Sequence, residues 1–349
     1  MSDLVDIGFL EPCADWLLTN KFFRSKVGGK PAWLELKHLP SPKDILCEEC
    51  GDPCVFLCQI YAPLDGKENC FHRMLFIFVC LKSSCYKPNQ CKNIKVYRSQ
   101  LARKNDYFSF DPPSEDVPSD PVPSPVPLCV VCGCRGPQLC SKCKTTSYCG
   151  VVHQRIDWKH GHKATCGQVA NTSSISSILF PQYEIVTEPE EVEPTKKLSE
   201  EDNEKDQMNE YRKLVNEGKA GDLEDLTESE LDSYAEQSED KYFLKFRKRI
   251  ANDPDQILRY ERGGNPLWLS PVVPKNITSC DYCGGARVFE CQIMPQLLNS
   301  LKNDSIDWGT LAIYTCEQSC DPPGQGYARE YIFKQDVLET DSHHSANDQ

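Results

Sequence analysis

One phrase occurs twice in the chain, and this repeat constrains the fold more than any other feature of the sequence. GGKPAWL at residues 28–34 returns as GGNPLWL at residues 263–269. Three further matches follow in the same order: CEEC (47–50) with CDYC (280–283), VFLCQIYAPL (55–64) with VFECQIMPQL (288–297), and LFIFVCLKSSC (75–85) with LAIYTCEQSC (311–320). All four offsets lie between 233 and 236 residues. Four ordered matches at a nearly constant offset indicate an internal duplication, whose period is far too long for a solenoid.

The matched segments have the alternating pattern of β-strands. Apolar side chains occupy every second position, at Phe56, Cys58 and Ile60 in the first copy and at Phe289, Cys291 and Ile293 in the second. A second pair of strands follows, with Leu75, Ile77 and Val79 matching Leu311, Ile313 and Thr315. A period of two with β-branched and aromatic residues predicts a half-buried strand. The fold class is therefore predicted as α+β, mostly β, with two related β-rich halves that pack together.

Two residue pairs within the repeat have both a functional and a structural interpretation. Trp33 and Trp268 could mark a ligand site, but a large aromatic side chain that anchors each core is the favoured interpretation. Cys58 and Cys291 are interpreted as small buried hydrophobic residues and not as nucleophiles. The Gly-Gly pair before each Pro-x-Trp-Leu supplies a turn that tolerates positive φ.

Charge and proline content divide the chain into ordered pieces and linkers. Residues 184–240 carry 21 acidic and six basic residues, a net charge of −15, whereas the whole chain of 349 residues carries −13. Few aromatic residues and many Glu, Ser and Asp predict disorder there. The prolines of DPPSEDVPSDPVPSPVP predict an extended linker. The predicted pieces are an N-terminal half (1–110), a Pro-rich linker (111–127), a middle piece (128–167), an acidic disordered linker (168–240), a C-terminal half (241–336) and a disordered tail (337–349).

The cysteines indicate metal binding more than disulfides. The chain has 21 of them, and its first residues show no basic segment followed by an apolar run, so we expect no secretory signal. In a reducing compartment, paired cysteines at short spacing indicate metal ligands. The most apolar window, MLFIFVCL at 74–81, is too short to span a bilayer, so no membrane association is expected. The expected locations are the cytoplasm and the nucleus.

Each half contains two cysteine pairs. The predicted ligands are Cys47, Cys50, Cys80 and Cys85 in the first half and Cys280, Cys283, Cys316 and Cys320 in the second. A Cys-x-x-Cys turn presents two thiolates, and a second pair from a neighbouring hairpin would complete a tetrahedral zinc site. Free buried thiols are the alternative. A redox couple is disfavoured because no thioredoxin-like βαβ context is visible.

The middle piece carries the strongest single signal. Its ligand-type residues come in four pairs: Cys129-x2-Cys132, Cys140-x2-Cys143, Cys149-x3-His153 and His162-x3-Cys166. Eight such residues in fewer than forty positions fit two tetrahedral zinc sites. The piece has no long apolar pattern, so metal must supply much of its folding free energy.

This order of ligands resembles the MYND zinc finger family. The resemblance implies that the pairs interleave. The first zinc would take Cys129, Cys132, Cys149 and His153, and the second would take Cys140, Cys143, His162 and Cys166. His153 stands where most family members have cysteine, but imidazole is an equally good zinc ligand. His160 competes with His162, and the H-x3-C register favours His162. Cys134 falls outside the pattern.

The resemblance also implies what the finger binds. MYND fingers bind proline-containing peptides of partner proteins and are not catalytic. This finger carries six Lys or Arg against one acid, Asp157, which is compatible with nucleic acid. No base-reading recognition helix is visible, however, so direct nucleic-acid binding is disfavoured.

The complete layout, a MYND finger between two related halves, resembles the programmed cell death protein 2 family over nearly the full chain. DPDQILRYERGGNPLW, at 253–268, is the most specific stretch outside the finger. Just before it, Phe243, Phe246 and Ile250 fall on one face of a predicted helix. KFRKR at 245–249 could serve as a nuclear signal, but a solvated basic helix face is the favoured interpretation.

The family resemblance implies a function. Its members act as dedicated chaperones of small-subunit ribosomal protein S2 and support biogenesis of the small ribosomal subunit. A groove between the two β-rich halves would suit a bound polypeptide, and an acidic segment could screen a basic client. The alternative is an adaptor that recruits transcriptional corepressor or signalling partners through the finger.

Sequence motifs of common enzymes are absent. The chain contains no GxGxxG, GxxxxGK[ST], GxSxG or HExxH. Its paired carboxylates occur mainly in the acidic segment, where no pocket could shift their pKa. We therefore expect a protein without catalytic activity.

Overall fold

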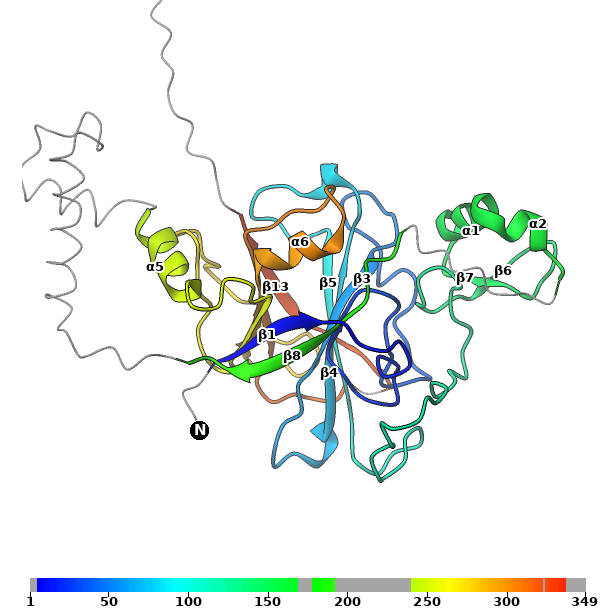
Figure 1. The fold of residues 1–349 in the computed structure, drawn as a ribbon, viewed down its shortest axis with the longest axis horizontal. Helices are drawn as coiled ribbons and strands as arrows, with labels where there is room; N and C mark the ends of the chain where they lie inside the picture. The colour runs from blue at the N-terminus through cyan, green and yellow to red at the C-terminus, as the bar shows by residue number, and fades with distance from the viewer. Residues whose placement is uncertain (1–4, 169–177, 192–239, 323, 337–349) are drawn as a thin grey trace, which may run out of the picture.

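The fold is built on one large antiparallel sheet (Figure 1). The structure, a computed structural model, describes residues 5–168, 178–191, 240–322 and 324–336. Eleven strands lie in the order β12-β5-β4-β3-β2-β8-β1-β9-β10-β11-β13. The predicted class, α+β and mostly β, is confirmed. Among the described residues, no helix has both the length and the apolar character that crossing a bilayer requires.

The two halves of the sheet have the same topology. The N-terminal half contributes β2 (Lys26–Val27), β3 (Val55–Tyr61), β4 (His72–Val79) and β5 (Ile94–Leu101). The C-terminal half contributes β9 (Leu258–Tyr260), β10 (Arg287–Ile293), β11 (Thr310–Cys316) and β13 (Tyr331–Gln335). In each half every strand pairs antiparallel with the next one in this order. Equal pairing order in both halves is what an internal duplication predicts.

A repeated hydrogen bond explains why the Gly-Gly phrase and the Cys-Gln-Ile segment recur together. Gln59 Oε1 accepts a hydrogen bond from the backbone N–H of Ala32 at 3.0 Å. In the second half, Gln292 Oε1 accepts from the N–H of Leu267 at 2.8 Å. Ala32 and Leu267 hold the same place in the repeated phrase. The strand glutamine therefore holds the loop against the sheet in both halves.

β3 and β10 each carry a β-bulge at the same place. Their register with the neighbouring strand shifts between Phe56 and Cys58 and between Phe289 and Cys291. The extra residue changes which face the following side chains occupy. Phe56 therefore lies in an outer cluster with Trp33, whereas Cys58 lies in the interior core. The prediction of one apolar face on a half-buried strand was wrong, because the bulge divides the pattern and both faces of β3 are covered.

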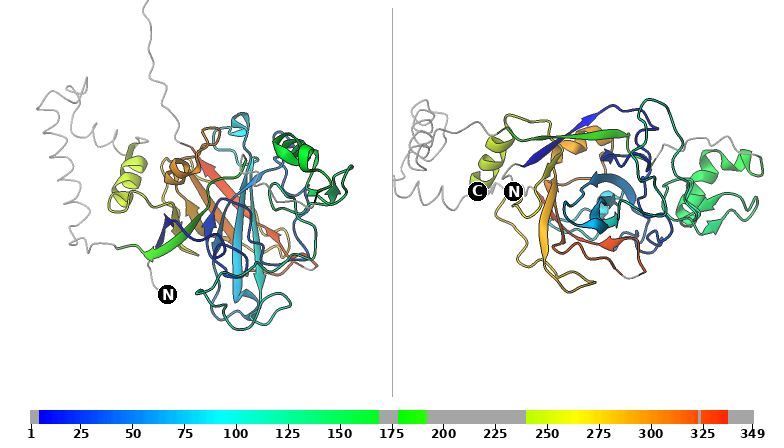
Figure 2. Two further views of the ribbon diagram at one scale, coloured as in Figure 1. Left: turned by 45° about the vertical axis from the view of Figure 1, so that its right-hand side comes forward. Right: turned by 90° about the horizontal axis from the view of Figure 1, so that it is seen from below.

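Two further strands join the halves along one side of the sheet. β1 (Asp6–Glu11) pairs with β9 of the C-terminal half, and β8 (Tyr183–Pro189) pairs with β2 of the N-terminal half. β1 and β8 also pair antiparallel with each other. Figure 2 shows them side by side, β1 in blue and β8 in green. Each half thus receives one added strand, and the two added strands form the seam between the halves.

Strand β8 corrects the predicted acidic linker. The prediction of disorder over 168–240 was wrong for residues 178–191, since β8 pairs on both sides and Ile185 is buried in the interior core. Averaging composition over a long acidic segment concealed a short strand within it. The other predicted disordered residues, 169–177, 192–239 and 337–349, lie outside the described part of the chain.

A single stretch of chain closes the opposite side of the sheet. β12 (Ala328–Arg329) pairs with β5, and β13 follows it directly and pairs with β11. Between them, the N–H of Glu330 donates to the carbonyl of Val96 at 3.0 Å. Because this stretch hydrogen-bonds with both halves, the sheet forms a near-barrel. The predicted packing of the two halves against each other is therefore observed.

Matching positions of the two halves fill the interior of the near-barrel. The core includes Leu75, Ile77 and Cys58 from the first half and Leu311, Ile313 and Cys291 from the second. The short helices of the two halves are η1 (Glu68–Cys70), η2 (Ser83–Cys85), η4 (Pro295–Leu297) and α6 (Leu298–Leu301). Leu297 and Leu301 from η4 and α6 join the same core.

Helix α5 (Asp240–Ile250) precedes the C-terminal half, as predicted. Phe246 is buried against Leu269 and Met294, and Ile250 packs beside them. Phe243, which we predicted on the same buried face, is instead exposed and lies near the guanidinium of Arg247. The turn of helix α5 that contains Phe243 is therefore not covered by any of the described residues.

The Pro-rich segment 111–127 contains neither helix nor strand, as its prolines predict. It nevertheless lies against the N-terminal half. The Asn20 side chain accepts from the N–H of Val122 and donates to its carbonyl, each at 3.0 Å. Ser124 Oγ donates to the carbonyl of Leu36 at 3.3 Å. These contacts hold an extended segment that leads into the finger.

A buried ion pair links the two halves across the near-barrel. Arg73 of β4 and Glu290 of β10 are both 0% exposed, and Arg73 Nη2 donates to Glu290 Oε2 at 2.7 Å. Arg73 Nε donates to Ser319 Oγ at 2.9 Å. Burial by itself would raise the pKa of Glu290, but the charge and hydrogen bonds of Arg73 outweigh it and keep that pKa below its usual range.

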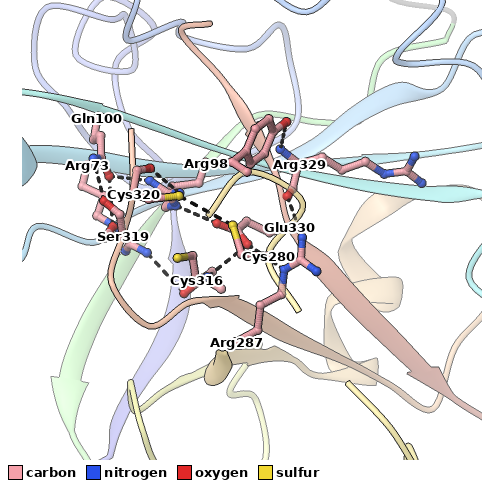
Figure 3. A network of polar contacts seen from close by, with 12 residues as sticks. Arg73, Arg98, Gln100, Cys280, Arg287, Cys316, Ser319, Cys320, Arg329 and Glu330 are labelled. Carbon is pink, nitrogen blue, oxygen red and sulfur yellow. Dashed lines mark hydrogen bonds and ion pairs between the residues drawn. The ribbon is translucent and has the colours of Figure 1, made fainter. Parts of the chain in front are cut away.

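A second buried carboxylate, that of Glu330, lies in the stretch 328–335 that pairs with both halves. Glu330 accepts from Arg98 Nε at 2.7 Å and from Arg287 Nε at 3.1 Å. Figure 3 shows these two arginines, one from each half, converging on Glu330 beside Cys280, Cys316 and Cys320. Because the two guanidinium groups and the carboxylate are paired by hydrogen bonds, their charges are compensated inside the fold.

Glu290→Ala should destabilise the protein strongly. The substitution leaves Arg73 charged and unpaired in the interior, and breaking a buried pair in this way costs about 3–5 kcal/mol of the free energy of unfolding. Urea denaturation measures the change. The double substitution R73M/E290L should recover most of the loss, because it removes both charges.

The matched control is Asp106→Ala, which removes the partner of Lys37 in a pair where both side chains are more than half exposed. It should leave the denaturation midpoint unchanged. Equal midpoints for Glu290→Ala and Asp106→Ala would show that the Arg73–Glu290 pair does not hold the halves together.

Candidate metal centres

Sixteen cysteine and histidine side chains gather in four groups of four. Within each group the ligand atoms all lie within 4.8 Å of one another. The groups are Cys47, Cys50, Cys80 and Cys85; Cys129, Cys132, Cys149 and His153; Cys140, Cys143, His162 and Cys166; and Cys280, Cys283, Cys316 and Cys320. The structure thus brings together the four predicted sets, including the interleaved order that the MYND resemblance implied for the finger.

All four groups are built on the same backbone turn. The residue four positions after the first cysteine donates its N–H to that cysteine's carbonyl at 2.9 Å in every case: Gly51, Gly133, Lys144 and Gly284. This residue has positive φ, 57° at Lys144 and 72–74° at the three glycines. Glycine adopts such values without strain. The turn directs both thiols of a Cys-x-x-Cys pair toward one point, as a tetrahedral zinc site requires.

The distances in the finger agree with that geometry. Cys132 Sγ lies 3.8 Å from Cys149 Sγ in the first group, and Cys140 Sγ lies 3.9 Å from Cys166 Sγ in the second. A tetrahedral zinc with Zn–S bonds of about 2.3 Å would hold its sulfurs roughly 3.8 Å apart. The donor sets of three thiols and one imidazole therefore fit zinc in both charge and spacing.

The two histidines would use different ring nitrogens. His153 turns Nδ1 toward Cys149 Sγ at 3.0 Å, and His162 turns Nε2 toward Cys143 Sγ at 3.6 Å. His160 is exposed and belongs to none of the four groups, so the register that favoured His162 agrees with the geometry. Cys134 also lies outside them, and its carbonyl accepts from the N–H of Cys129 at 2.7 Å.

The surroundings of Cys143 favour its thiolate. Hydrogen bonds from the Thr145 side chain and backbone lower the pKa of Cys143 to about 5. Only a deprotonated thiol binds zinc, so a lowered pKa reduces the free energy needed to release the proton. The Cys143 thiolate is therefore available to a cation at neutral pH.

In the two halves, the second cysteine pair comes from the end of a strand. Cys80 follows β4 directly and lies 3.7 Å from Cys50, while Cys316 ends β11 and lies 3.6 Å from Cys283. The first half spaces its pair by four residues, and η2 accommodates the extra one. The second half spaces its pair by three and turns at Ser319, whose φ is 46°. The change in spacing therefore leaves the clustering of thiols intact.

Backbone N–H groups also point at the sulfurs. Lys82 N–H donates to Cys80 Sγ and Gly285 N–H donates to Cys283 Sγ, each at 3.4 Å. Such hydrogen bonds stabilise thiolates around a bound metal. Sequence spacing alone gave no sign of them.

The seven cysteines outside these groups include the two from the repeated strands. Cys58 and Cys291 are fully buried in the interior core, and burial raises the pKa of both thiols. Buried neutral thiols are chemically inert. Their interpretation as small hydrophobic residues is confirmed.

The finger is compact, and a buried hydrogen bond within it stabilises its fold. It contains β6 (Gln138–Leu139), β7 (Ser147–Tyr148), α1 (Val151–Asp157), η3 (Trp158–His162) and α2 (Lys163–Thr165). It projects from one side of the near-barrel (Figure 1). Buried Tyr148 donates its hydroxyl to buried Asp157 at 2.5 Å, so the finger's one acidic side chain serves its fold.

The finger docks on the N-terminal half through the repeated phrase. Trp33 Nε1 donates to the carbonyl of Gly133 at 2.8 Å, and Lys30 Nζ donates to the carbonyl of Val130 at 2.7 Å. Trp33 is 2% exposed and packs against Phe76 and Phe78. The interpretation of Trp33 as a core anchor is confirmed, and its second role, holding the finger, was missed because spacing does not show which surfaces meet.

Comparison with known proteins agrees with this layout. Three family models match the chain: programmed cell death protein 2, N-terminal domain, at residues 4–115; MYND finger at 129–166; and programmed cell death protein 2, C-terminal putative domain, at 240–336. The chain is 44% identical to programmed cell death protein 2 of Rattus norvegicus over 96% of its own length and 97% of that protein. The chain belongs to the programmed cell death protein 2 family. The MYND match implies that its finger binds zinc.

More distant members of the family cover a similar share of the chain. Programmed cell death protein 2-like of Homo sapiens is 29% identical over 86% of each chain. A Schizosaccharomyces pombe protein named probable 20S rRNA accumulation protein 4 is 26% identical over 88% of this chain and 91% of its own. No solved structure matches the chain.

The structure adds a feature that the family models do not contain. β8, at Tyr183–Pro189, falls outside both models, which end at residue 115 and begin again at residue 240. It nevertheless lies at the centre of the sheet. The two family domains therefore share one sheet instead of folding as separate units.

Native mass spectrometry of the reduced full-length protein should detect four zinc ions. The reason is that all four groups share one turn and one tetrahedral spacing. Cys283→Ser should lower the count to three by removing the exposed thiolate of the C-terminal group. A count of two that Cys283→Ser leaves unchanged would restrict zinc to the finger.

Trp33→Phe should loosen the finger. The substitution leaves the buried carbonyl of Gly133 without its donor, which costs about 1–3 kcal/mol. Hydrogen exchange of the finger amides should accelerate accordingly.

Trp268→Phe is the matched control, because the Trp268 indole has no hydrogen-bond partner among the described residues. It should leave exchange in the finger unchanged. Equal protection in both variants would mean that the Trp33–Gly133 bond does not hold the finger.

Proposed function

We propose that this chain is a dedicated chaperone of small-subunit ribosomal protein S2 and that it supports biogenesis of the small ribosomal subunit. The observation that carries the proposal is similarity along nearly the whole chain to a fission yeast protein named for 20S rRNA accumulation. That name points to ribosome production, and membership of the programmed cell death protein 2 family supports S2 as the client.

The fold supports a binding role more than a catalytic one. Much of the chain's polar chemistry is used to hold the fold: the buried carboxylates Glu290 and Glu330 pair with arginines, and sixteen cysteine and histidine side chains form closed groups of four. Four closed donor sets suit structural metal and leave no open coordination position for substrate. We therefore propose a protein without enzymatic activity.

The near-barrel limits how a client could bind. The stretch 328–335 pairs with both β5 and β11, so it already occupies most of the outer edge of β11 and part of that of β5. A client is therefore expected on surface grooves instead. One such cleft, of about 760 Å³, lies between the halves and the finger, with Tyr97, Arg135 and Tyr282 in its wall.

The charge distribution suits a basic client. Residues 184–240 carry a net charge of −15. An acidic segment near a bound basic protein would compete with nucleic acid for it and keep it soluble. With such a client, the proposed locations are the cytoplasm, where ribosomal proteins are made, and the nucleus, where subunits are assembled.

One observation favours a second role as an adaptor. The finger exposes apolar side chains, with Leu139 at 52% and Val151 at 50% exposure. An apolar finger surface would suit the proline-containing peptides that MYND fingers bind. Under this alternative the finger recruits transcriptional or signalling partners, and the near-barrel serves as its support.

Affinity purification of the tagged full-length chain should recover ribosomal protein S2 as the main partner in near-equal amount. The finger variant L139D/V151D separates the two functions, since both side chains are exposed and the fold should persist. S2 recovery should be unchanged in this variant. Deleting the whole finger would be less informative, because it would uncover Trp33.

Two outcomes would contradict the chaperone proposal. One is the absence of S2 from the purified material while chromatin or signalling proteins dominate. The other is loss of the main partner in L139D/V151D at an unchanged melting temperature, which would support the adaptor function.

A further inference from the structure

The duplication places two copies of one surface on the molecule. In the N-terminal half, this surface is formed by Lys30, Trp33, Phe56 and Phe78, and the finger turn Val130–Gly133 covers it. The equivalent residues of the C-terminal half are Asn265, Trp268, Phe289 and Tyr314. The repeat thus supplies a second surface of the same ancestry, on a half that carries no finger.

In the C-terminal half this surface is an open groove of about 370 Å³. Its walls include Pro266, Trp268, Val273, Ile277, Phe289 and Tyr314. Trp268 is only partly buried and meets Phe333 edge to face, at 5.7 Å between ring centroids. Val273 and Ile277 are 40% and 36% exposed. Apolar side chains at this exposure, gathered around a groove, mark an interaction surface.

The two copies differ in the hydrogen-bond acceptor of the tryptophan indole N–H. Trp33 Nε1 donates to a backbone carbonyl of the finger. The indole N–H of Trp268 makes no hydrogen bond to any residue in the part of the chain that the structure describes. A buried indole normally finds an acceptor within the protein, whereas a half-buried indole can take its acceptor from a bound partner.

The finger shows which chemistry this surface accepts. Its docking turn contributes two backbone carbonyls, the apolar Val131 and a glycine, and no acidic or basic side chain, whereas the N-terminal half contributes the ammonium of Lys30. Gly133 allows close approach, since a Cβ there would lie 2.8 Å from Lys30 Cβ. The surface therefore accepts a tight, uncharged stretch of main chain.

The open groove differs in charge from the surface at Trp33, which carries the ammonium of Lys30. Among its described lining residues, Arg287 is the one charged side chain, and it already pairs with Asp281 at 3.0 Å and Glu330 at 3.1 Å. Asn265 replaces the cation of Lys30. A neutral groove with aromatic and proline walls does not select phosphate or other strongly charged ligands, but it fits an apolar peptide.

We propose that the groove at Trp268 is a docking site for an uncharged polypeptide segment of a partner protein. The segment presents a main-chain carbonyl to the indole N–H of Trp268 and small apolar side chains to Phe289 and Tyr314, as the finger turn does at Trp33. This site is separate from the finger and from the four cysteine groups. It does not depend on which client the chain escorts.

The test uses the full-length protein with ¹⁵N-labelled tryptophan indoles and the peptide acetyl-PLSVVSGS-amide. This peptide copies residues 127–134 with serine in place of the three cysteines. The Trp268 resonance is assigned as the one missing in Trp268→Phe. Peptide addition should shift the Trp268 indole N–H downfield, as a new hydrogen bond requires, and leave that of Trp33 in place.

Ile277→Glu is the matched variant, because Ile277 is exposed and its replacement should not affect folding. A carboxylate at the groove wall should weaken peptide binding at least tenfold while the melting temperature stays the same. The peptide acetyl-PLSDDSGS-amide should bind at least tenfold more weakly to the parent protein, since it places charge in a neutral groove.

Several results would overturn the proposal. One is an unmoved Trp268 resonance at millimolar peptide, and another is equal binding to the parent protein and Ile277→Glu. A change of this resonance on deleting residues 192–239 or 337–349 would assign the groove to the chain itself. A change with protein concentration alone would assign it to a second copy.

Discussion

A single buried carboxylate connects the features on which this structure depends. Glu330 lies where the last strand passes from one half of the sheet to the other, and it accepts from an arginine of each half. Its Oε2 also accepts from the N–H of Cys316 at 3.1 Å, and its own N–H donates to Val96. Glu330 therefore takes part in closing the near-barrel, in compensating buried charge and in placing Cys316, a member of the C-terminal cysteine group. Because these contacts share atoms, the free energies of closure and of the cysteine group are expected to be coupled.

The duplication was retained in the architecture but used differently in its two copies. Both halves keep the bulge, the glutamine that holds the loop, and the four-thiol group. The surfaces around their tryptophans diverged. The surface at Trp33 is covered by the finger, and the surface at Trp268 is an open groove. The same surface thus makes a structural contact in one half and forms the proposed docking site in the other.

The sequence predicted the repeated segments well, but it predicted strand pairing and the contacts between distant segments poorly. The grouping of cysteines was accessible because the Cys-x-x-Cys turn is local, and its geometry follows from a few backbone angles. The bulge after Phe56 was not accessible, since an alternating pattern looks the same until strands pair. Strand β8 was missed because its acidic surroundings dominate any average of composition. The hydrogen bond from Trp33 to Gly133 joins residues one hundred positions apart, and nothing in either local sequence indicates the other.

By itself, the sequence determined the duplication, the mostly β class and the pairs of cysteine and histidine ligands, because periodicity and ligand spacing are properties of short segments. The interleaved grouping of those pairs in the finger came from the family resemblance. Only the tertiary structure decided that two halves close into one near-barrel, that β1 and β8 form their seam, and that one tryptophan surface is covered while its counterpart is open. Those outcomes depend on long-range pairing and on which buried donors find acceptors. Such partners are chosen by the packed chain as a whole, where each unpaired group would cost free energy.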